Sequence, residues 1–265
     1  MAAIDPMEQF LVHRIAPLTP IPVPGLGVID LSITNSVLFM LISAGLISLF
    51  FLVATKRAVV PGRMQAAAEM LYGMVDNTMT GGIIGDEGRP FLPFIFTLFL
   101  LIAFLNVLGL TPGGFSVTSQ LAVTTALAIM TFVTVIVVGF VRNGLGFFRL
   151  FLPAGMPLAI ALLILPIELI SFFVRPLTLA MRLFGNMLGG HVVTYMFASF
   201  VIGLGIFGIE GAGIAKLGLI GSGVSFAMIV ALMALEFIVA FLQAFVFAAL
   251  ACVYLNEVVN LGHGH

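Results

Sequence analysis

The sequence predicts an all-α integral membrane protein with five membrane crossings, and three observations support that fold class. Of the 265 residues, 62% are hydrophobic and 8% are charged, whereas soluble domains are about 25% charged. The apolar residues form long runs without strand-like alternation, so the membrane-embedded backbone has to satisfy its hydrogen bonds within helices. A net charge of −1 without a basic run excludes a nucleic-acid partner, and a single cysteine excludes a disulfide framework.

Five apolar stretches are long enough to cross a membrane, at about 31–54, 91–110, 118–141, 157–203 and 222–259. A crossing needs about 20 apolar residues, so each of the first three stretches fits one helix. The last two are about twice that length. We expect them to be two long helices, tilted or bent, joined by the glycine-rich segment 204–221. A re-entrant turn or an additional crossing inside either stretch stays open.

The rest of the chain divides into an N-terminal segment and a surface helix. Residues 1–30 contain several prolines and no apolar run, which is typical of an extracytoplasmic segment and not of a cleavable signal peptide. Residues 31–265 then form a single transmembrane domain. Apolar residues at helical spacing over 64–79 predict an amphipathic helix on the inner membrane surface, ended by Gly81 and Gly82.

Positive charges predict the orientation of the five crossings. Cytoplasmic loops are enriched in lysine and arginine. One side of the threaded chain carries two such residues and the other carries six, which are Lys56, Arg57, Arg63, Arg89, Arg142 and Arg149. The two on the opposite side are Arg14 and Lys216. We therefore expect the N-terminus outside and the C-terminus inside.

Every ionisable residue within the spans lies in the last two of them. These residues are Glu168, Arg175, Arg182, His191, Glu236 and Glu257. A charge near the bilayer centre costs roughly 2.5–3.5 kcal/mol on insertion scales, so such groups are functional by default. Arg182 lies too deep in its apolar run for its side chain to reach the interface. The last two helices are therefore expected to face polar surroundings within the membrane.

Helical geometry arranges these groups into faces. A seven-residue step returns to nearly the same face, so Glu168, Arg175 and Arg182 form one stripe, and Asn186 stays close to it. His191 points to the opposite side. On the fifth span, Glu236 and Gln243 share a face by the same rule.

Residue chemistry separates the roles. Arginine keeps its proton at physiological pH, so Arg182 can act only as a fixed positive charge, whereas glutamate and histidine can titrate. No carboxylate stands three or four residues from Arg182. Its counter-ion therefore comes from another helix or another protein. Two purely structural pairings remain as alternatives, Arg175 with Glu168 and Arg182 with Glu236.

The run from Glu168 to His191, ELISFFVRPLTLAMRLFGNMLGGH, resembles subunit a of the F-type ATP synthase, the stator subunit of its membrane motor. Further matches are NVLGLTP at 106–112, TSQL at 118–121 and LEFIVAFLQAF at 235–245. The resemblance runs from the first span to about Tyr254 and is weakest in the first thirty residues. It implies two long tilted helices in a hairpin beside a rotating ring of c subunits, each of which bears one carboxylate.

The resemblance also implies a role for each candidate residue. Arg182 takes the position of the essential arginine that faces the ring carboxylate, with Asn186 and Gln243 as polar positions beside it. Glu168 matches the acidic residue of an inner half-channel, and His191 and Glu236 match titratable positions of an outer one. The order of histidine before glutamate is that of the mitochondrial type. Asn106 is a further expected polar lining residue, while Gly109 stands where some bacterial members have an aspartate.

These inferences predict a proton-translocating stator and not an enzyme in its own right. Its expected partners are the c ring, b-type peripheral-stalk subunits, the catalytic head, protons and membrane lipid, with no cofactor and no metal. The expected location is a bacterial inner membrane, with a mitochondrial inner membrane as the weaker choice. A secondary transporter that binds an anionic solute at Arg182 is the alternative, although transporters of that kind usually show two related halves and broken helices.

Overall fold

A computed structural model describes residues 10–16, 21–23, 27–29, 32–55, 62–111, 113–151, 158–211 and 213–261. Lys56 and Arg57, used above for orientation, lie outside these ranges, as does most of the predicted N-terminal segment. The chain divides into two compact units. The first comprises Met1–Ser43, Leu105–Gln120 and Phe184–Leu242, and the second comprises Ala44–Phe104, Leu121–Leu183 and Gln243–His265.

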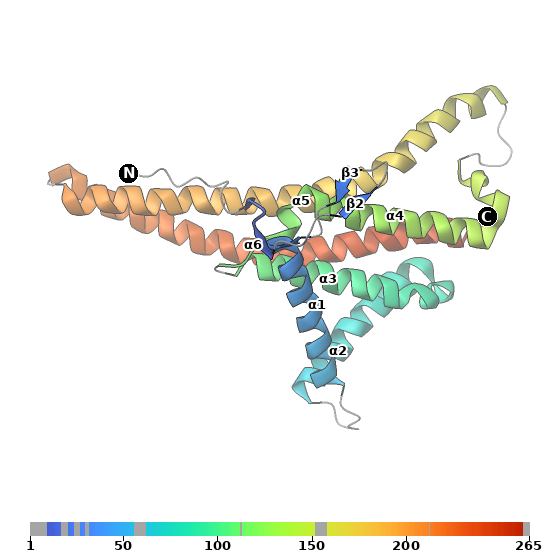
Figure 1. Ribbon diagram of the computed structural model, residues 1–265, viewed down its shortest axis with the longest axis horizontal. Coiled ribbons are helices and arrows are strands. Elements are labelled where there is room, and N and C mark those ends of the chain that lie inside the picture. Colours follow the sequence, from blue (N-terminus) through green and yellow to red (C-terminus); the bar gives the residue numbers. More distant parts are fainter. Residues whose placement is uncertain are drawn as a thin grey trace. The chain divides into compact units, whose positions relative to one another are not determined.

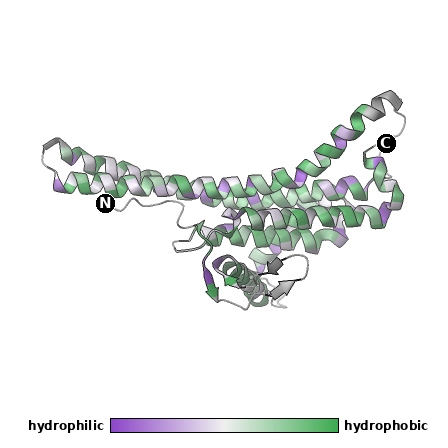
Figure 2. Cartoon of the chain, turned by 45° about the horizontal axis from the view of Figure 1, so that its top comes forward, coloured by the Kyte–Doolittle hydropathy of each residue, from purple (hydrophilic) through white to green (hydrophobic). Residues whose placement is uncertain are grey.

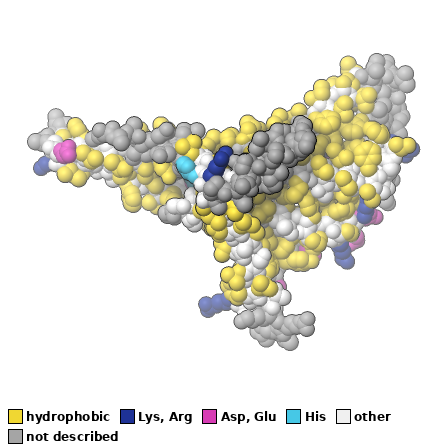
Figure 3. Space-filling model, in the orientation of Figure 1, with side chains coloured by type: hydrophobic (Ala, Val, Ile, Leu, Met, Phe, Trp, Pro, Cys, Tyr) yellow, Lys and Arg dark blue, Asp and Glu magenta, His cyan; other side chains and the backbone are white. Residues whose placement is uncertain are grey.

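Five helices in the described part of the chain are long and apolar enough to cross a membrane, which confirms the predicted number. Hydrophobic residues dominate these helices along their length, and hydrophobic side chains cover most of the face shown in space-filling form (Figures 2 and 3). Their bounds are α1 Asn35–Ala54, α3 Leu92–Gly109, α4 Leu121–Asn143, α5 Leu158–Glu210 and α6 Leu217–Val259 (Figure 1).

The last two helices are continuous. α5 has 53 residues, including Pro166 and Pro176, and α6 has 43 residues. At 1.5 Å per residue they are about 80 Å and 65 Å long, against a hydrocarbon core of about 30 Å. Neither contains the re-entrant turn left open by the sequence. Helices of this length fit a bilayer only with strong tilt or with ends outside the hydrocarbon.

Within the first unit, α5 and α6 form an antiparallel hairpin (Figure 1). The structure differs from the sequence expectation in the connection, because α5 continues to Glu210 and α6 already begins at Leu217. The glycines between them mostly lie inside the helices and let the backbones approach. A Cβ atom on Gly208 would lie 2.7 Å from the Leu219 nitrogen, and one on Gly218 would lie 2.7 Å from the Leu204 carbonyl oxygen. Small residues permit this kind of close packing in membrane helices.

The second unit contains the surface segment, which begins with α2 at Arg63–Met74. A π-helix follows at Val75–Ile84 and a 3-10 helix at Asp86–Phe91. The expectation that Gly81 and Gly82 end the helix is therefore wrong. Their missing side chains fit the wide π-turns, because a Cβ at either glycine would lie 2.9 Å from the carbonyl oxygen five residues earlier. The turn comes instead at Gly85, whose φ of 87° suits glycine.

The core of the second unit is apolar and rich in phenylalanine. Phe172 of α5 packs against Phe132 of α4, with ring centroids 4.8 Å apart. Hydrogen bonds fix the end of α6, because the Asn143 amide donates to the Val258 carbonyl at 2.6 Å and the Asn260 amide donates to the Ile84 carbonyl at 3.2 Å. These contacts join α4 to the parts of α5 and α6 that belong to the second unit.

The described residues of the first unit include four short strands, which the sequence did not indicate. β1 Arg14–Ala16 pairs antiparallel with β4 Ile33–Thr34, and β2 Ile21–Val23 pairs antiparallel with β3 Gly27–Ile29. The Asn35 side chain fastens the preceding segment, because its Nδ2 donates to the Leu11 carbonyl at 3.1 Å and its Oδ1 accepts from the His13 amide at 3.3 Å. The segment before α1 is thereby held at the start of that helix.

The hairpin packing predicts opposite effects for the same substitution at two glycines of α6. Gly218→Ala should lower the unfolding temperature, because the new methyl group overlaps α5 and overpacking costs about 1–3 kcal/mol. Gly223→Ala should raise it slightly or leave it unchanged, because nothing lies within 4 Å of the added methyl and alanine favours helix. Thermal unfolding of the two purified variants in detergent tests this, and equal unfolding temperatures would contradict it.

Candidate functional site

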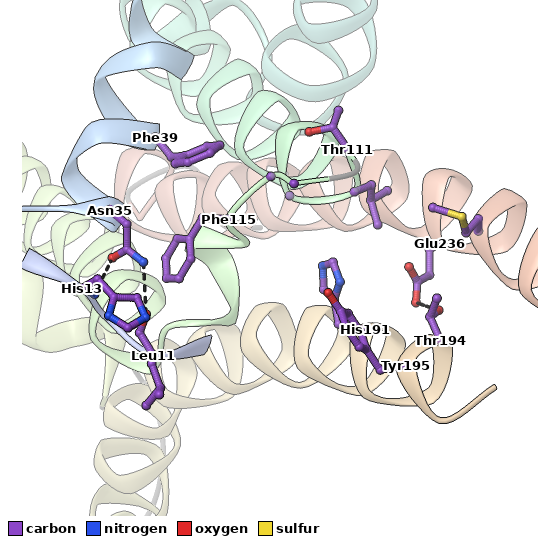
Figure 4. A pocket seen from close by; sticks show the side chains of 15 residues that line it. Leu11, His13, Asn35, Phe39, Thr111, Phe115, His191, Thr194, Tyr195 and Glu236 are labelled. Carbon is purple, nitrogen blue, oxygen red and sulfur yellow. Dashed lines mark hydrogen bonds between the residues drawn. The ribbon is translucent and has the colours of Figure 1, made fainter. Parts of the chain in front are cut away.

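The first unit contains a cavity of about 490 Å³ into which two predicted site residues project (Figure 4). His191 and Thr194 come from α5, and Glu236 comes from α6. The opposite wall is built by Asn35 at the start of α1 and by His13 before it. A cavity of this size lined by such polar groups has room for several water molecules, since one water occupies about 30 Å³.

Glu236 is held by neutral groups. The Thr194 hydroxyl donates to its Oε1 at 3.2 Å (Figure 4). Gly190 makes room for the carboxylate, because a Cβ atom there would lie 2.3 Å from the same oxygen. Within the described part of this unit Glu236 forms no ion pair. The carboxylate is therefore positioned without a fixed cation to keep it ionised.

His191 lies against the same cavity and is half-buried. Its ring packs edge-on against Phe10 at a centroid distance of 6.2 Å. The side-chain amide of Gln120 donates to the Phe10 carbonyl at 2.8 Å and holds that residue in place. The His191 Nε2 is buried and has no hydrogen-bond partner among the described residues. Such an atom is normally satisfied by water when protein partners are lacking.

The two asparagines of the first unit differ in their surroundings. Asn186 lines a small hollow of about 10 Å³ together with His191 and Glu236, so the structure brings these three predicted residues together. Asn106 is completely buried on α3, and its Nδ2 donates to the Ala240 carbonyl of α6 at 3.0 Å. The side chain therefore joins two helices. Its role as a lining residue of a proton path stays a prediction.

In the second unit, Arg175 binds two carboxylates. It forms an ion pair with Glu257 of α6 and a looser one with Glu168, at 3.7 Å between Nη2 and Oε1. The guanidinium also lies over the rings of Tyr254 and Phe172, at 5.2 and 5.8 Å from their centroids. The Arg175–Glu168 pairing that the sequence left open is therefore present. One cation faces two carboxylates, so the cluster carries an excess negative charge when both are ionised.

Arg182 stands apart from this cluster. It is exposed on α5, and no carboxylate in the described part of its unit forms an ion pair with it. Phe173, Leu177 and Met181, which precede it on α5, are exposed as well. A permanent cation thus projects from an apolar helix surface.

Gln243 of α6 belongs to the second unit and is buried, with 5% of its surface exposed. Sequence reasoning missed the roles of Gly190 and Thr194, and it named Glu257 without pairing it with Arg175. Two signals in the sequence point to Thr194 and to the position of Glu257. Thr194 follows His191 by three residues on one helix face, and Glu257 continues the seven-residue series of Glu236 and Gln243.

Among the described residues, no group of three or more histidine, cysteine, aspartate or glutamate side chains is arranged to hold a metal ion.

Comparison with known proteins gives consistent results. The sequence pattern of the family described as ATP synthase A chain matches residues 37–256. The ATP synthase subunit a of Allorhizobium ampelinum is 47% identical over 262 residues, covering 98% of this chain and 99% of the relative. The proteins of the same name from Hyphomonas neptunium and Agrobacterium fabrum are 48% and 47% identical, over 97% and 98% of this chain and 97% and 100% of the relatives.

The Arg175 cluster predicts strong coupling between its two partners. In a double-mutant cycle of Arg175→Met and Glu257→Met, the pair should show a coupling free energy of about 1–3 kcal/mol, because each single change leaves a partly buried charge uncompensated. The exposed pair Arg89–Asp86 is the matched control and should couple by less than about 0.5 kcal/mol. Unfolding of the wild type, the four single variants and the two double variants in a denaturing detergent measures both cycles. Equal coupling in the two would contradict the interpretation.

Proposed function

Because the chain belongs to the ATP synthase A chain family, we propose that it is the proton-translocating stator subunit of a rotary ATP synthase in a bacterial inner membrane. It works as a component of the synthase and not as an enzyme by itself. It provides the c ring with two aqueous half-channels and separates them with the positive charge of Arg182.

The exposure of Arg182 carries this proposal. An arginine on an apolar helix surface requires a counter-ion, and no carboxylate in the described part of its own unit supplies one. A carboxylate on a protein that moves past this face would do so. The c ring is such a partner, with one carboxylate on each of its subunits.

Electrostatics then give the direction of the reaction. A ring carboxylate that carries a proton is neutral and can pass through lipid, since the desolvation cost of a charge is avoided. On reaching Arg182 it is favoured in its ionised form and releases its proton. The same cation repels a proton that would cross directly between the two half-channels. The membrane potential supplies about 2.3 kcal/mol per charge per 100 mV to this cycle.

The outer half-channel is proposed at the cavity of the first unit. Glu236 and His191 can both exchange protons, and both line that cavity. The neutral support from Thr194 and Gly190 leaves Glu236 able to take up and release a proton without breaking an ion pair. Asn186 adds a polar side chain beside His191 and Glu236, at the small hollow that these three residues line in the first unit.

The inner half-channel is proposed at Glu168 in the second unit. Its contact with Arg175 is loose, at 3.7 Å, while Arg175 pairs closely with Glu257. Glu257 therefore neutralises most of the arginine charge, and Glu168 keeps its capacity to accept a proton from the ring. Gln243 and Asn106 are proposed as further polar positions of the proton path.

The distribution of charge supports the proposed orientation, with the N-terminus outside and the C-terminus inside. The inward cations that the structure describes, Arg63, Arg89, Arg142 and Arg149, all belong to the second unit. Arg14 and Lys216 belong to the first unit. The proposed partners are the c ring, b-type stalk subunits and the catalytic head.

The transporter alternative has no support of its own in the fold. Transporters that bind anionic solutes within the membrane commonly use interrupted helices whose ends point at the solute. Here both helices that carry the intramembrane charges are continuous over their described length. Purification in mild detergent distinguishes the two functions, because a stator elutes with a c ring and a catalytic head.

The proposal predicts that Arg182→Ala abolishes ATP synthesis, because the ring carboxylate then loses the charge that drives proton release. ATP synthesis in inverted membrane vesicles measures this, and ATP hydrolysis by the detached head should be unchanged. Arg149→Ala is the matched control, since Arg149 is an exposed arginine of the same unit and should tolerate the change. Normal ATP synthesis by an assembled Arg182→Ala complex would contradict the proposed role of Arg182 in proton release.

Glu236→Gln should slow ATP synthesis by about 100-fold, the scale of a lost proton-transfer group. Thr194→Val should slow it by about two- to tenfold, because it removes one hydrogen bond worth about 0.5–1.5 kcal/mol. Glu210→Gln, at the exposed end of α5, serves as the control and should retain full activity. Proton pumping driven by ATP in the same vesicles provides the second readout. If Glu236→Gln pumped like the control, the outer path would have to be placed elsewhere.

A further inference from the structure

A second cavity, of about 260 Å³, lies within the second unit where the end of α1 faces the first turns of α2. Phe51 and Thr55 line it from the α1 side, and Gln65, Glu69 and Tyr72 line it from α2. The proton path proposed above uses none of these residues. The cavity is therefore a separate feature that calls for its own explanation.

The orientation of the Gln65 amide is determined by its neighbour. Its Nε2 donates to the Glu69 carboxylate at 2.8 Å. A carboxylate only accepts, so the amide nitrogen has to face it and the oxygen has to point away. That oxygen, Oε1, is buried and has no hydrogen-bond partner among the described residues. Buried acceptors without a donor are rare in native structures and require a reason.

The polar groups that the described residues present to this cavity are mostly acceptors. Glu69 offers a carboxylate, and the Thr55 hydroxyl donates its proton to the Phe51 carbonyl at 2.6 Å, which leaves its oxygen as an acceptor. The Tyr72 phenol can donate or accept, and no lysine, arginine or histidine is among the described residues that line the cavity. A carboxylate beside a hydroxyl oxygen fits a cation that carries N–H groups.

Aromatic walls reinforce this preference. Phe51 and Tyr72 both pack edge-on against Phe96, at centroid distances of 5.5 and 5.6 Å, so their positions in the wall are fixed. The negative face of an aromatic ring attracts a cation. The cavity thus offers hydrogen-bond acceptors and aromatic surface to the same group.

The position of the cavity indicates where that cation comes from. Ala54 is the last residue of α1, a 20-residue apolar helix of membrane-spanning length. Its end therefore lies at the boundary between hydrocarbon and headgroups, where tyrosine side chains such as Tyr72 are enriched. Phospholipid headgroups are a source of ammonium cations at this depth.

We propose that this cavity binds the primary ammonium group of a phosphatidylethanolamine-type lipid. Two N–H donors of the ammonium match the Glu69 carboxylate, which the Gln65 amide holds in place, and the Thr55 oxygen, whereas a quaternary ammonium has no N–H group to offer them. Arg63, the first residue of α2 and exposed, stands two residues before Gln65 and is available to the lipid phosphate. The bound lipid would fasten the surface helix α2 to the end of α1.

The test is photo-crosslinking of the purified, assembled complex with phosphatidylethanolamine that bears a diazirine in its acyl chain, leaving the headgroup intact. The wild-type chain should be labelled within residues 51–72, as mapped by mass spectrometry. Glu69→Gln and Gln65→Leu should each reduce this labelling by about tenfold, the scale of a lost charge-assisted or buried hydrogen bond. Asp86→Asn, which alters a carboxylate 98% exposed and outside the cavity, should leave it unchanged.

Other lipids and the assembly itself provide the overturning outcomes. Equal labelling by the corresponding phosphatidylglycerol or phosphatidylcholine probe would overturn the proposal, because those headgroups lack a primary ammonium. Loss of a neighbouring subunit from the Glu69→Gln complex, with no labelling of the wild type, would assign the cavity to a basic side chain of a protein partner. Labelling does not depend on proton transport, so the result stands apart from the proposed function of Arg182.

Discussion

A guanidinium exposed on the hydrophobic surface of α5 sets the requirements for the rest of this protein. Burying it against its own chain would have needed a carboxylate nearby, and the described part of its unit provides none that pairs with it. The charge is stable in a membrane only if a partner brings a carboxylate or if water reaches it. Both solutions require polar surroundings close to an apolar helix face. The two clusters of titratable residues on α5 and α6 are consistent with that requirement.

The two clusters hold their carboxylates in chemically different ways. Glu236 is held by a hydroxyl and by the space at Gly190, so no permanent charge fixes its protonation state. Glu168 stands near a permanent charge, but Glu257 takes the closer position on Arg175. In each cluster one carboxylate is thereby left without a close ion pair. Such a group can change its charge at modest cost, which is what a site that exchanges protons needs.

The sequence predicted the fold well because hydrophobic length and composition determine it. Five apolar helices, two of them unusually long, follow from run lengths alone. The ends of α5 and α6 were placed wrongly because glycine was interpreted as a helix breaker at 204–221. In the structure Gly208 and Gly218 are packing positions, and only contacts with the opposite helix distinguish the two roles. The π-helix through Gly81 and Gly82 was not predicted, because these two glycines were also interpreted as the end of a helix.

The sequence indicates the candidate residues of the site by their type, but it does not indicate most of their contacts. Arg182, His191 and Glu236 were identified from charge in an apolar run, which requires no tertiary information. Sequence spacing is a signal for Thr194 and Glu257, but the contacts of Thr194, Gly190 and Glu257 depend on the packing of α5 against α6. The four short strands before α1 depend on pairing and on the Asn35 side chain, and no local periodicity encodes them. Tertiary contacts decided these features.

An arginine suits position 182 because its side chain stays charged when no carboxylate is near it. A lysine in an apolar setting can release its proton when no carboxylate is near, and the site would then lose its field. A guanidinium remains charged throughout, so in the proposed cycle each arriving carboxylate would meet the same potential. Its planar fork could also bind that carboxylate with two hydrogen bonds and release it as the partner moves. A permanent charge with an exchangeable partner is therefore the arrangement that the proposed stator function requires of an apolar surface.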